Sequence, residues 1–458
     1  MLRLWGSKPN ELALGQEFKL RNAGAAGIVG RKLGEGGQGA VYMCDVGGRQ
    51  LALKWYHPHV VEIDRTLRSR IERLISEEPP DKRFLFPIDL ATINGRDEFG
   101  YVMPVVSEDR RPFSDIRSPP PNRLVLSLET WATVCYEIAE SFQNLHTRGL
   151  CYQDINFGGF FIDPIRGGVL ICDPDNITAE GLLGGVLGAP GFMAPEIVRG
   201  EAIPSSRTDL HSMAVVFFYA LFQWHPLHGR REAALETRTL DTLAAFYRSE
   251  PPFMFDPGDG SNRPPGGDPF FDWLTARWTA MPASLRDLFL RTFTKGLRNP
   301  DERVVELEWR AAMARLRDAV TRCPACAFEV PLEPAPAGTP QPQCPACQAT
   351  VPRPVRMTLG RYLVPMLPTR QLYAHHVDGT AAITLRDSVA SVDVHPSDET
   401  IVGLRNLTPS AWQGRTGDGK PIVIVPGRTI RILDGLGIDF GRREGLVAGA
   451  DQVAKTAA

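Results

Sequence analysis

The stretch Leu33-Gly-Glu-Gly-Gly-Gln-Gly-Ala-Val-Tyr42 decides how this chain is interpreted, because it fits the pattern G-x-G-x-x-G-x-V. The pattern falls on Gly34, Gly36, Gly39 and Val41. Glycines let backbone N–H groups come close to phosphate oxygens, so the stretch is a candidate phosphate-binding loop. Glycine-rich hairpins are also common, and the pattern alone leaves a purely structural hairpin open.

The residues on either side of this loop favour phosphate binding. A strand rather than a helix follows the loop, which disfavours a dinucleotide-binding crossover. The next strand carries Leu51-Ala-Leu-Lys54, and a lysine there matches a point charge for phosphates, although a single lysine at a strand end is usually a solvated one. Across residues 26–106, short β-like runs surround one charged helical stretch near Val61–Glu77, so we expect a small sheet carrying one helix.

With this context, the chain resembles the eukaryotic-type protein kinases over residues 26–320. The later motifs follow in the family's order: Tyr152-Gln-Asp154 for His-Arg-Asp, Asp173-Pro-Asp175 for Asp-Phe-Gly, Ala194-Pro-Glu196, a helix starting near Asp209, and Arg303 as the partner of Glu196. The resemblance implies an α+β, bilobal kinase-like fold, with an N-lobe over 26–106 and a C-lobe over 107–320. It also implies a Ser/Thr protein kinase that uses ATP with Mg²⁺ or Mn²⁺.

The resemblance implies roles for individual residues as well. Asp154 would accept the proton of a substrate hydroxyl, Lys54 would hold phosphates and Asp173 would bind Mg²⁺. A glutamate about 18 residues after Lys54 should pair with it, and Glu72 fits, with Glu62 and Glu77 as competitors. The resemblance also implies contacts with the nucleotide. They are made by Gly34, Gly36, Gly39, Val41, Ala52, Phe161, the gatekeeper Met103 and the hinge residues Pro104 and Val106. For the apolar residues among them, plain core packing is the alternative.

One position departs from the family in a way that bears on activity. Five residues after Asp154, where the family has an asparagine that binds a second Mg²⁺, this chain has Gly159. A second metal would then be held by Asn156, Asp175 or Asn176, or be absent, and we expect reduced transfer. The alternative is a pseudokinase scaffold that binds nucleotide weakly or not at all, and a third possibility uses ATP for another acceptor.

The activation segment departs from the family too. Gln153 replaces the arginine that reads a phosphorylated activation loop. Between Asp175 and Ala194 the only hydroxyl side chain is that of Thr178. We therefore expect no control through phosphorylation of this segment.

Two cysteine pairs predict a metal site after the kinase lobes. Cys323-Pro-Ala-Cys326 and Cys344-Pro-Ala-Cys347 are C-x-x-C motifs with 17 residues between them, the arrangement of a Cys₄ zinc ribbon, here over 321–352. Disulfides or inert thiols are the alternative. With four sulfur ligands the Zn²⁺ would be structural, and Pro331–Gln343 would be the ribbon's loop.

The remainder of the chain reads as short strands and turns. We expect a small all-β, sandwich-like domain over 353–447, followed by a tail at 448–458. At the other end of the chain, we expect residues 1–25 to form a lead before the kinase lobes. Pro426–Gly441 faintly resembles a forkhead-associated phosphothreonine reader, with a plain structural sandwich as the favoured alternative. His375 and His376 would point to opposite faces of a strand, without a third metal ligand, and stay unassigned.

Composition limits the partners and the location. The chain has 458 residues and a net charge of −2, from 51 Lys+Arg and 53 Asp+Glu, so it offers no general field for nucleic acid or anionic lipid. The longest apolar run, Met213–Phe222, is too short to span a membrane and predicts a buried helix. Without a cleavable signal at the N-terminus we expect a cytoplasmic protein.

A narrower resemblance concerns the partners. The segments Tyr152–Pro164 and Leu170–Asn176 look most like a bacterial kinase group that works beside von Willebrand-type and PP2C-type phosphatase partners. These proteins form tellurite- and stress-associated phosphorylation triads. The resemblance implies a protein substrate or signalling partner of that kind.

Overall fold

The computed structural model describes residues 11–333 and 339–449, and none of the helices in these two ranges is long and apolar enough to cross a membrane. Parts of the predicted lead, ribbon loop and tail lie outside the described residues. The chain divides into two compact units, one made of the residues up to Val125, Glu137–Arg263 and Leu290–Glu306, and the other of Leu126–Tyr136, Pro264–Phe289 and the residues from Leu307. This division does not follow the expected boundary at residue 320.

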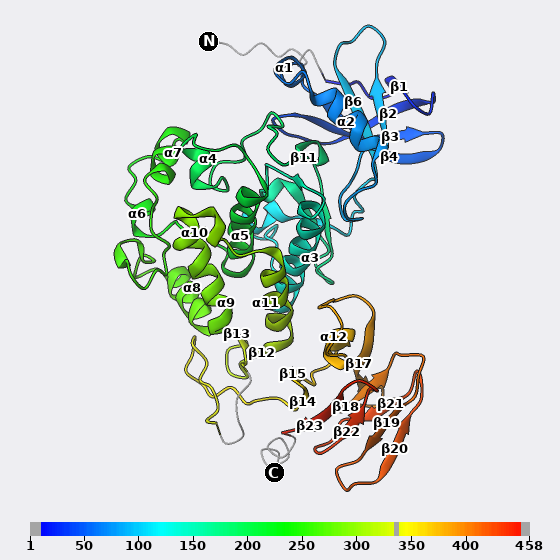
Figure 1. The fold of residues 1–458 in the computed structure, drawn as a ribbon, viewed down its shortest axis with the longest axis vertical. Helices are drawn as coiled ribbons and strands as arrows, with labels where there is room; N and C mark the ends of the chain where they lie inside the picture. The colour runs from blue at the N-terminus through cyan, green and yellow to red at the C-terminus, as the bar shows by residue number, and fades with distance from the viewer. Residues whose placement is uncertain (1–10, 334–338, 450–458) are drawn as a thin grey trace. The chain divides into compact units, whose positions relative to one another are not determined.

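The first unit begins with a closed barrel of strands in the order β1-β2-β3-β4-β6-β5 (Figure 1). The strands are β1 (Glu17–Leu20), β2 (Ala26–Glu35), β3 (Gly39–Val46), β4 (Arg49–Tyr56), β5 (Asp89–Thr92) and β6 (Phe99–Met103). Apolar side chains that alternate along these strands fill the barrel, among them Phe18, Val29, Tyr42 and Leu53. Because β1 pairs with both β2 and β5, the sheet begins before residue 26, within the segment we expected to be a lead.

Two helices, α1 (Pro58–Ile63) and α2 (Leu67–Ser76), stand where we expected one. The break falls at Asp64, whose backbone leaves the helical conformation. Helix α2 buries Leu67, Ile71 and Leu74, which recur every three or four residues and form its apolar stripe.

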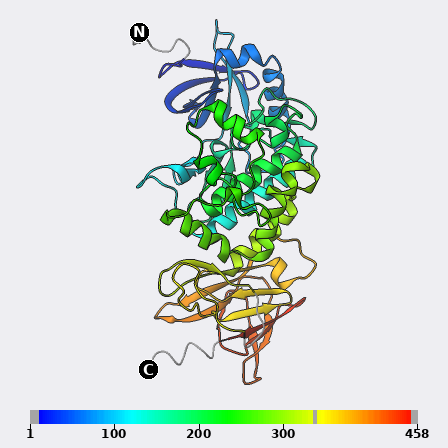
Figure 2. The ribbon, with the colours of Figure 1, turned by 90° about the vertical axis from the view of Figure 1, so that its left-hand side faces the viewer.

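The rest of the first unit is mainly helical, with the buried helix α5 (Ser206–Phe222) inside it. Ser205 and Thr208 form a capping box that starts α5, and the predicted apolar run Met213–Phe222 is nearly all buried within it. Figure 2 shows the blue barrel strands at one side of the cyan and green helices of this unit. The other helices are α4 (Pro195–Val198), α6 (Arg230–Ala233), α7 (Leu240–Arg248) and α10 (Lys295–Arg298), with short strands β7 (Arg111–Pro112), β8 (Leu150–Cys151), β9 (Phe160–Ile162), β10 (Val169–Ile171) and β11 (Thr178–Ala179). Helix α3 (Leu128–His146) is divided between the two units after Tyr136.

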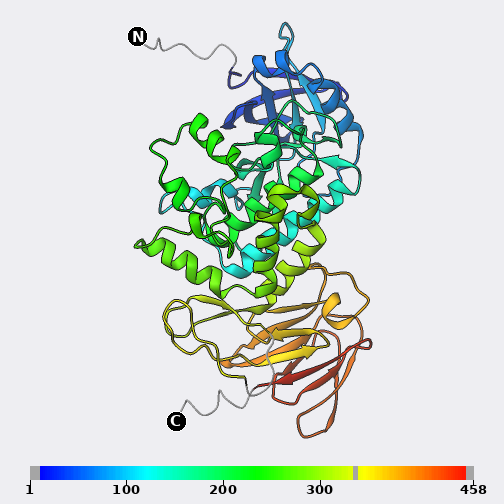
Figure 3. The ribbon, with the colours of Figure 1, turned by 60° about the vertical axis from the view of Figure 1, so that its left-hand side comes forward.

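The second unit combines helices with two antiparallel sheets that share one core (Figure 3). Met357 and Val364 of the first sheet lie in the same apolar cluster as Leu372 and Leu404 of the second. Its helices are α8 (Pro269–Ala280), α9 (Ala283–Phe293) up to Phe289, and α11 (Glu306–Ala319) from Leu307. The first sheet contains β15 (Tyr362–Pro365), β14 (Arg356–Leu359), β23 (Glu444–Ala448), β22 (Gly437–Asp439), β19 (Trp412–Arg415) and β20 (Pro421–Ile424), and the second contains β16 (Gln371–Tyr373), β17 (Ser388–His395), β18 (Asp398–Asn406) and β21 (Thr429–Arg431).

The histidine pair lies on a short helix, α12 (Ala374–Val377), and not on a strand as expected. His376 Nδ1 accepts a hydrogen bond from the Tyr373 N–H at 3.0 Å, so its Nε2 carries the proton. That Nε2 lies 2.8 Å from Asp318 Oδ2. His376 therefore donates a hydrogen bond to the Asp318 carboxylate within the second unit.

Candidate active site

The glycine-rich loop joins β2 to β3 and closes on Lys54. A Cβ added at Gly39 would lie 2.3 Å from the Trp55 carbonyl oxygen, so only glycine fits there. At the tip of the loop, Gln38 Oε1 accepts a hydrogen bond from Lys54 Nζ at 3.0 Å. Gln38 Nε2 donates to Asn176 Oδ1 at 3.1 Å. The side chain of Gln38 thus links the loop to the lysine and to the turn that follows Asp173.

Lys54 on β4 is buried and paired with two carboxylates. Its Nζ lies 2.7 Å from Asp173 Oδ1 and 2.9 and 2.8 Å from the two oxygens of Asp175. Burial alone would lower the pKa of Lys54, but the charges of Asp173 and Asp175 outweigh it and hold the pKa above its ordinary value. Lys54 is therefore a fixed positive charge beside Asp173.

The prediction that Glu72 pairs with Lys54 is wrong in this structure. Glu72 is partly exposed on α2, where it contacts Arg21 and lies 3.5 Å from Arg68. Arg70 of the same helix donates to the Gly184 carbonyl at 2.9 Å. Two residues along an α-helix are about 200° apart around its axis. Because Arg70 points toward Gly184, Glu72 points to the opposite side of the helix.

Asp209 of α5 fixes the backbone of the catalytic loop. Its carboxylate accepts hydrogen bonds from the backbone N–H groups of Tyr152 at 2.6 Å and of Gln153 at 3.1 Å. His146 Nε2 also lies 3.1 Å from this carboxylate, and its Nδ1 contacts Glu306. A buried carboxylate with these donors fixes the backbone that carries Asp154.

Asp154 presents a carboxylate that is largely buried. Within the residues that the structure describes, its Oδ1 is buried and accepts no hydrogen bond. Burial raises the pKa of Asp154; the Asn156 side chain opposes this increase and the nearby charge of Asp173 adds to it. An acceptor oxygen that lacks a hydrogen-bond donor within the described residues suits a group that receives a proton from a hydroxyl.

Asp173 stands at the start of the short 3-10 turn Pro174–Asn176 and has a left-handed backbone, with φ of 50° and ψ of 52°. Its side chain is 38% exposed, whereas that of Asp175 is 1% exposed. Asp173 is thus the open carboxylate of the turn and the one that could hold a cation.

The three side chains proposed to replace the second metal ligand all have protein partners. Asn156 Oδ1 accepts from the Gly158 N–H at 2.7 Å, and Asp175 and Asn176 are bonded as described above. At position 159 itself, an added Cβ would lie 3.3 Å from the hydroxyl oxygen of Tyr152, which donates to the Cys172 carbonyl. Tyr152 therefore occupies space next to Gly159.

The residues expected around an adenine lie on β3, β4, β6 and β9. Strand pairing sets Ala52 opposite Met103, and Val41 opposite Lys54. Phe161 lies on β9, opposite Leu170 of β10. The expected hinge residues Pro104 and Val106 follow β6 directly, and Pro104 is exposed.

The activation segment is fastened at both ends. Gln153 Nε2 donates to Thr178 Oγ1 and to the Leu182 carbonyl, each at 2.5 Å, and Gln153 Oε1 accepts from the Gly184 N–H at 2.8 Å. Thr178 is only 2% exposed, so the one hydroxyl side chain of the segment is inaccessible. At the far end, Glu196 and Arg303 form the predicted ion pair through two hydrogen bonds of 2.7 Å.

Sequence reasoning missed Asp175 and Gln38 as partners of Lys54. Asp175 was considered only as a metal ligand. The available signal was its position two residues after Asp173, together with Tyr56 and Tyr101, whose hydroxyls donate to it at 2.9 and 3.4 Å. No spacing rule in the sequence pointed to Gln38.

Residues 28–261, slightly more than half of the chain, match the family described as protein kinase domain. The chain is 26% identical over 333 residues to Protein kinase YegI of Escherichia coli (strain K12), which covers 68% of this chain and 47% of that protein. It is 25% identical over 243 residues to Serine/threonine-protein kinase pkn2 of Myxococcus xanthus, covering 48% of this chain and 26% of that protein.

A third relative is the DNA damage-responsive serine/threonine-protein kinase RqkA of Deinococcus radiodurans, 25% identical over 210 residues, with 41% of this chain and 28% of that protein covered. The chain thus spans about a quarter to a half of the length of these relatives. The matched residues include the glycine loop, Lys54, Asp154 and Asp173, and the structure brings Lys54 Nζ to 2.7 Å from Asp173 Oδ1. Because this match extends over more than half of its residues, the chain belongs to the protein kinase family.

Proposed function

We propose that this protein is an ATP-dependent Ser/Thr protein kinase that transfers the γ-phosphate to a hydroxyl group of a protein partner. The observation that carries the proposal is the contact of Lys54 Nζ with Asp173 Oδ1 at 2.7 Å, beside a buried Asp154 oxygen that accepts no hydrogen bond within the described residues. These are a phosphate-holding cation, a metal-holding carboxylate and a proton acceptor, the groups that phosphoryl transfer requires.

The residues divide the work between them. Mg²⁺ or Mn²⁺, held by Asp173, would neutralise charge on the phosphates. Lys54 and the backbone N–H groups of the Gly34–Gly39 loop hold the phosphates in place. Asp154 orients the acceptor hydroxyl and takes its proton. Val41, Ala52, Phe161 and the chain after Met103 are proposed to hold the adenine.

A second candidate function, a pseudokinase scaffold, is favoured by one specific observation. Gly159 supplies no metal ligand, and Asn156, Asp175 and Asn176 are all engaged in hydrogen bonds with the protein. A site with one metal-binding carboxylate is expected to transfer more slowly than a site with two ligand sets, and in the limit to bind nucleotide without transfer.

Transfer of labelled γ-phosphate separates the two functions. The full chain is incubated with ATP and Mg²⁺ or Mn²⁺, alone and with a generic protein acceptor, beside Asp154→Asn, which keeps the shape of the side chain and removes its charge. Transfer by the wild type that falls at least about 100-fold in the variant supports the kinase. Equal signals from two folded proteins would contradict it and favour the scaffold.

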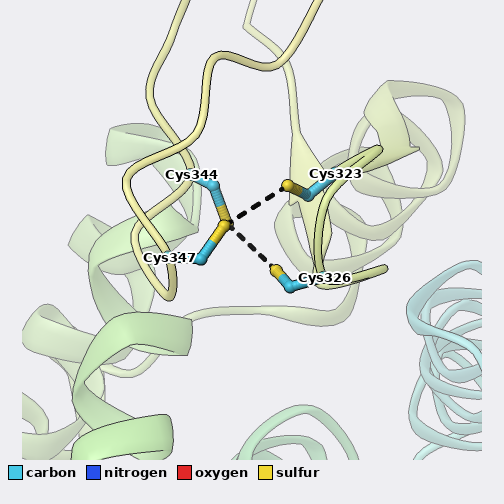
Figure 4. Close-up of side chains that lie close together, drawn as sticks. All are labelled: Cys323, Cys326, Cys344 and Cys347. Carbon is cyan, nitrogen blue, oxygen red and sulfur yellow. Dashed lines mark hydrogen bonds between the residues drawn. The ribbon is translucent and has the colours of Figure 1, made fainter.

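We also propose that Cys323, Cys326, Cys344 and Cys347 bind a structural Zn²⁺. The sulfurs of Cys323 and Cys347 are 3.7 Å apart, those of Cys326 and Cys344 are 3.6 Å apart, and Figure 4 shows all four side chains turned toward one another. Sulfurs about 2.3 Å from a tetrahedral zinc lie about 3.8 Å apart, whereas a disulfide requires about 2.05 Å. The observed separations fit the metal.

The two cysteine knuckles repeat the same backbone geometry. Ala327 and Gln348, each four residues after the first cysteine of its pair, have φ of 59° and 63°. In each knuckle the N–H of this residue donates to the carbonyl of that cysteine, at 2.9 and 2.8 Å. Such matched turns aim two pairs of thiolates at one point. Thiolates kept for a metal are typical of a reducing compartment, which supports the cytoplasmic location expected from the sequence.

The partners are proposed on the resemblance alone. A protein substrate follows from the kinase function. We propose von Willebrand-type and PP2C-type phosphatase proteins as the partners to test first, by co-purification with the full chain. For the two sheets of the second unit, phosphopeptide binding is a separate proposal to test, beside the plain structural role that the sequence favours.

A further inference from the structure

Asp175 is a buried carboxylate whose two oxygens are both in use. Oδ1 accepts from Lys54 Nζ at 2.9 Å and from the Tyr101 hydroxyl at 3.4 Å. Oδ2 accepts from Lys54 Nζ at 2.8 Å and from the Tyr56 hydroxyl at 2.9 Å. The residue is 2% exposed. Four contacts from three donors occupy the lone pairs of a carboxylate, so little capacity is left for a metal ion.

The two tyrosines can only serve as donors to this carboxylate. Burial raises the pKa of Tyr56 well above its ordinary value, and the charge of Asp175 raises it further; burial does the same for Tyr101. Both hydroxyls therefore keep their protons. A carboxylate with two phenol donors and one ammonium donor is fixed in position, and it fixes the ammonium in turn.

We propose that Asp175 is the positioning residue that aligns Lys54 for phosphate binding, in the place where Glu72 of helix α2 was expected. The inference rests on the proposed kinase function. Its consequence is that the carboxylate that aligns the lysine and the carboxylate that holds the metal, Asp173, belong to one short turn. The position of helix α2 then does not decide whether Lys54 is aligned.

The test compares Asp175→Asn with Glu72→Gln in the full chain. Each substitution removes one carboxylate charge and keeps the side-chain size. Loss of a charged hydrogen-bond partner of Lys54 is expected to lower kcat/KM for ATP about 10- to 100-fold in Asp175→Asn. Glu72→Gln is expected to change kcat/KM less than about twofold. The reverse ranking, with Glu72→Gln the damaged variant, would overturn the proposal.

A second readout does not require transfer. Binding of ATP with Mg²⁺ to the full chain is measured by isothermal titration calorimetry. Asp175→Asn should weaken this binding about 10-fold or more, because Lys54 loses the carboxylate that holds it in place for the phosphates. Glu72→Gln should leave the affinity unchanged. Equal affinities in wild type and Asp175→Asn would refute the assignment.

The two readouts keep the proposals apart. If the wild type binds ATP without transferring phosphate and Asp175→Asn weakens that binding, the kinase function fails and the positioning role stands. If transfer is present and neither readout responds to Asp175→Asn, the positioning role fails and the kinase function stands. Tyr56→Phe keeps the carboxylate and removes one of its donors, and it serves if Asp175→Asn does not fold. It should weaken ATP binding as well, because the carboxylate that holds Lys54 is then less firmly fixed.

Discussion

Replacement of Arg303 by methionine should destabilise the first unit strongly. The Arg303 side chain is fully buried and binds both oxygens of Glu196 at 2.7 Å, and it also donates to the carbonyls of Gly296 and Arg207, each at 2.9 Å. Methionine fills most of the volume but leaves the Glu196 carboxylate, which is 11% exposed, without its charge partner. Removal of one partner of a buried ion pair costs about 3–5 kcal/mol, so Arg303→Met should lower the free energy of unfolding by that amount.

The assay is urea unfolding of the full chain at neutral pH, followed by circular dichroism. Asp301→Ala is the matched control, because Asp301 forms an ion pair of 2.9 Å with Arg207 but both side chains are more than half exposed. Exposed pairs contribute about 0–1 kcal/mol. Glu196→Gln combined with Arg303→Met should recover part of the loss, because no unpaired charge then stays buried. A loss below about 1 kcal/mol for Arg303→Met, equal to that of the control, would refute the reasoning.

Three further predictions concern pH, packing and metal. Burial lowers the pKa of His146, but hydrogen bonds to Asp209 and Glu306 outweigh burial and raise the pKa from 6.5 to about 9. The ion pairs of His146 therefore stabilise the fold fully below pH 6.5, and this stabilisation is lost as the pH rises to about 9. The melting temperature should decrease over this range, and His146→Gln should make the decrease smaller. Gly159→Asn should lower the melting temperature, since its Cβ would lie 3.3 Å from the Tyr152 hydroxyl, and a rise in transfer without loss of stability would contradict the geometry. Purified protein should contain one zinc per chain by elemental analysis, and Cys326→Ser should reduce that content; full zinc in the variant would exclude this residue as a ligand.

The motif residues could be named from the sequence because each lies in a short pattern of neighbouring residues. Asp154, Asp173 and the Glu196–Arg303 pair were expected from their order in the sequence, and the structure places that ion pair as expected. The resemblance supplied the pairing across a separation of 107 residues. Composition and periodicity alone could not have done so.

The partner of Lys54 was not predictable in the same way. Counting 18 residues to Glu72 assumes one unbroken helix, whereas the chain leaves the helix at Asp64 and starts again at Leu67, which resets the rotation of every later side chain. Asp175 lies 121 residues from Lys54, and its burial between β4, β6 and the Pro174–Asn176 turn follows only from the assembled barrel. Strand β1 was missed because four residues are too few to establish a period.

The hydrogen bonds from Gln153 to the activation segment join neutral groups only. A change of ionic strength has no charge to screen there, and the enclosed Thr178 hydroxyl offers no place for a covalent mark. The rate at which such a site modifies a substrate then depends on how often the substrate reaches it. A module elsewhere on the chain that tethers a substrate can raise its effective concentration to the millimolar range without altering any group at the site. The residence time of the tethered substrate, more than any rearrangement of the segment, would then set how often it is modified.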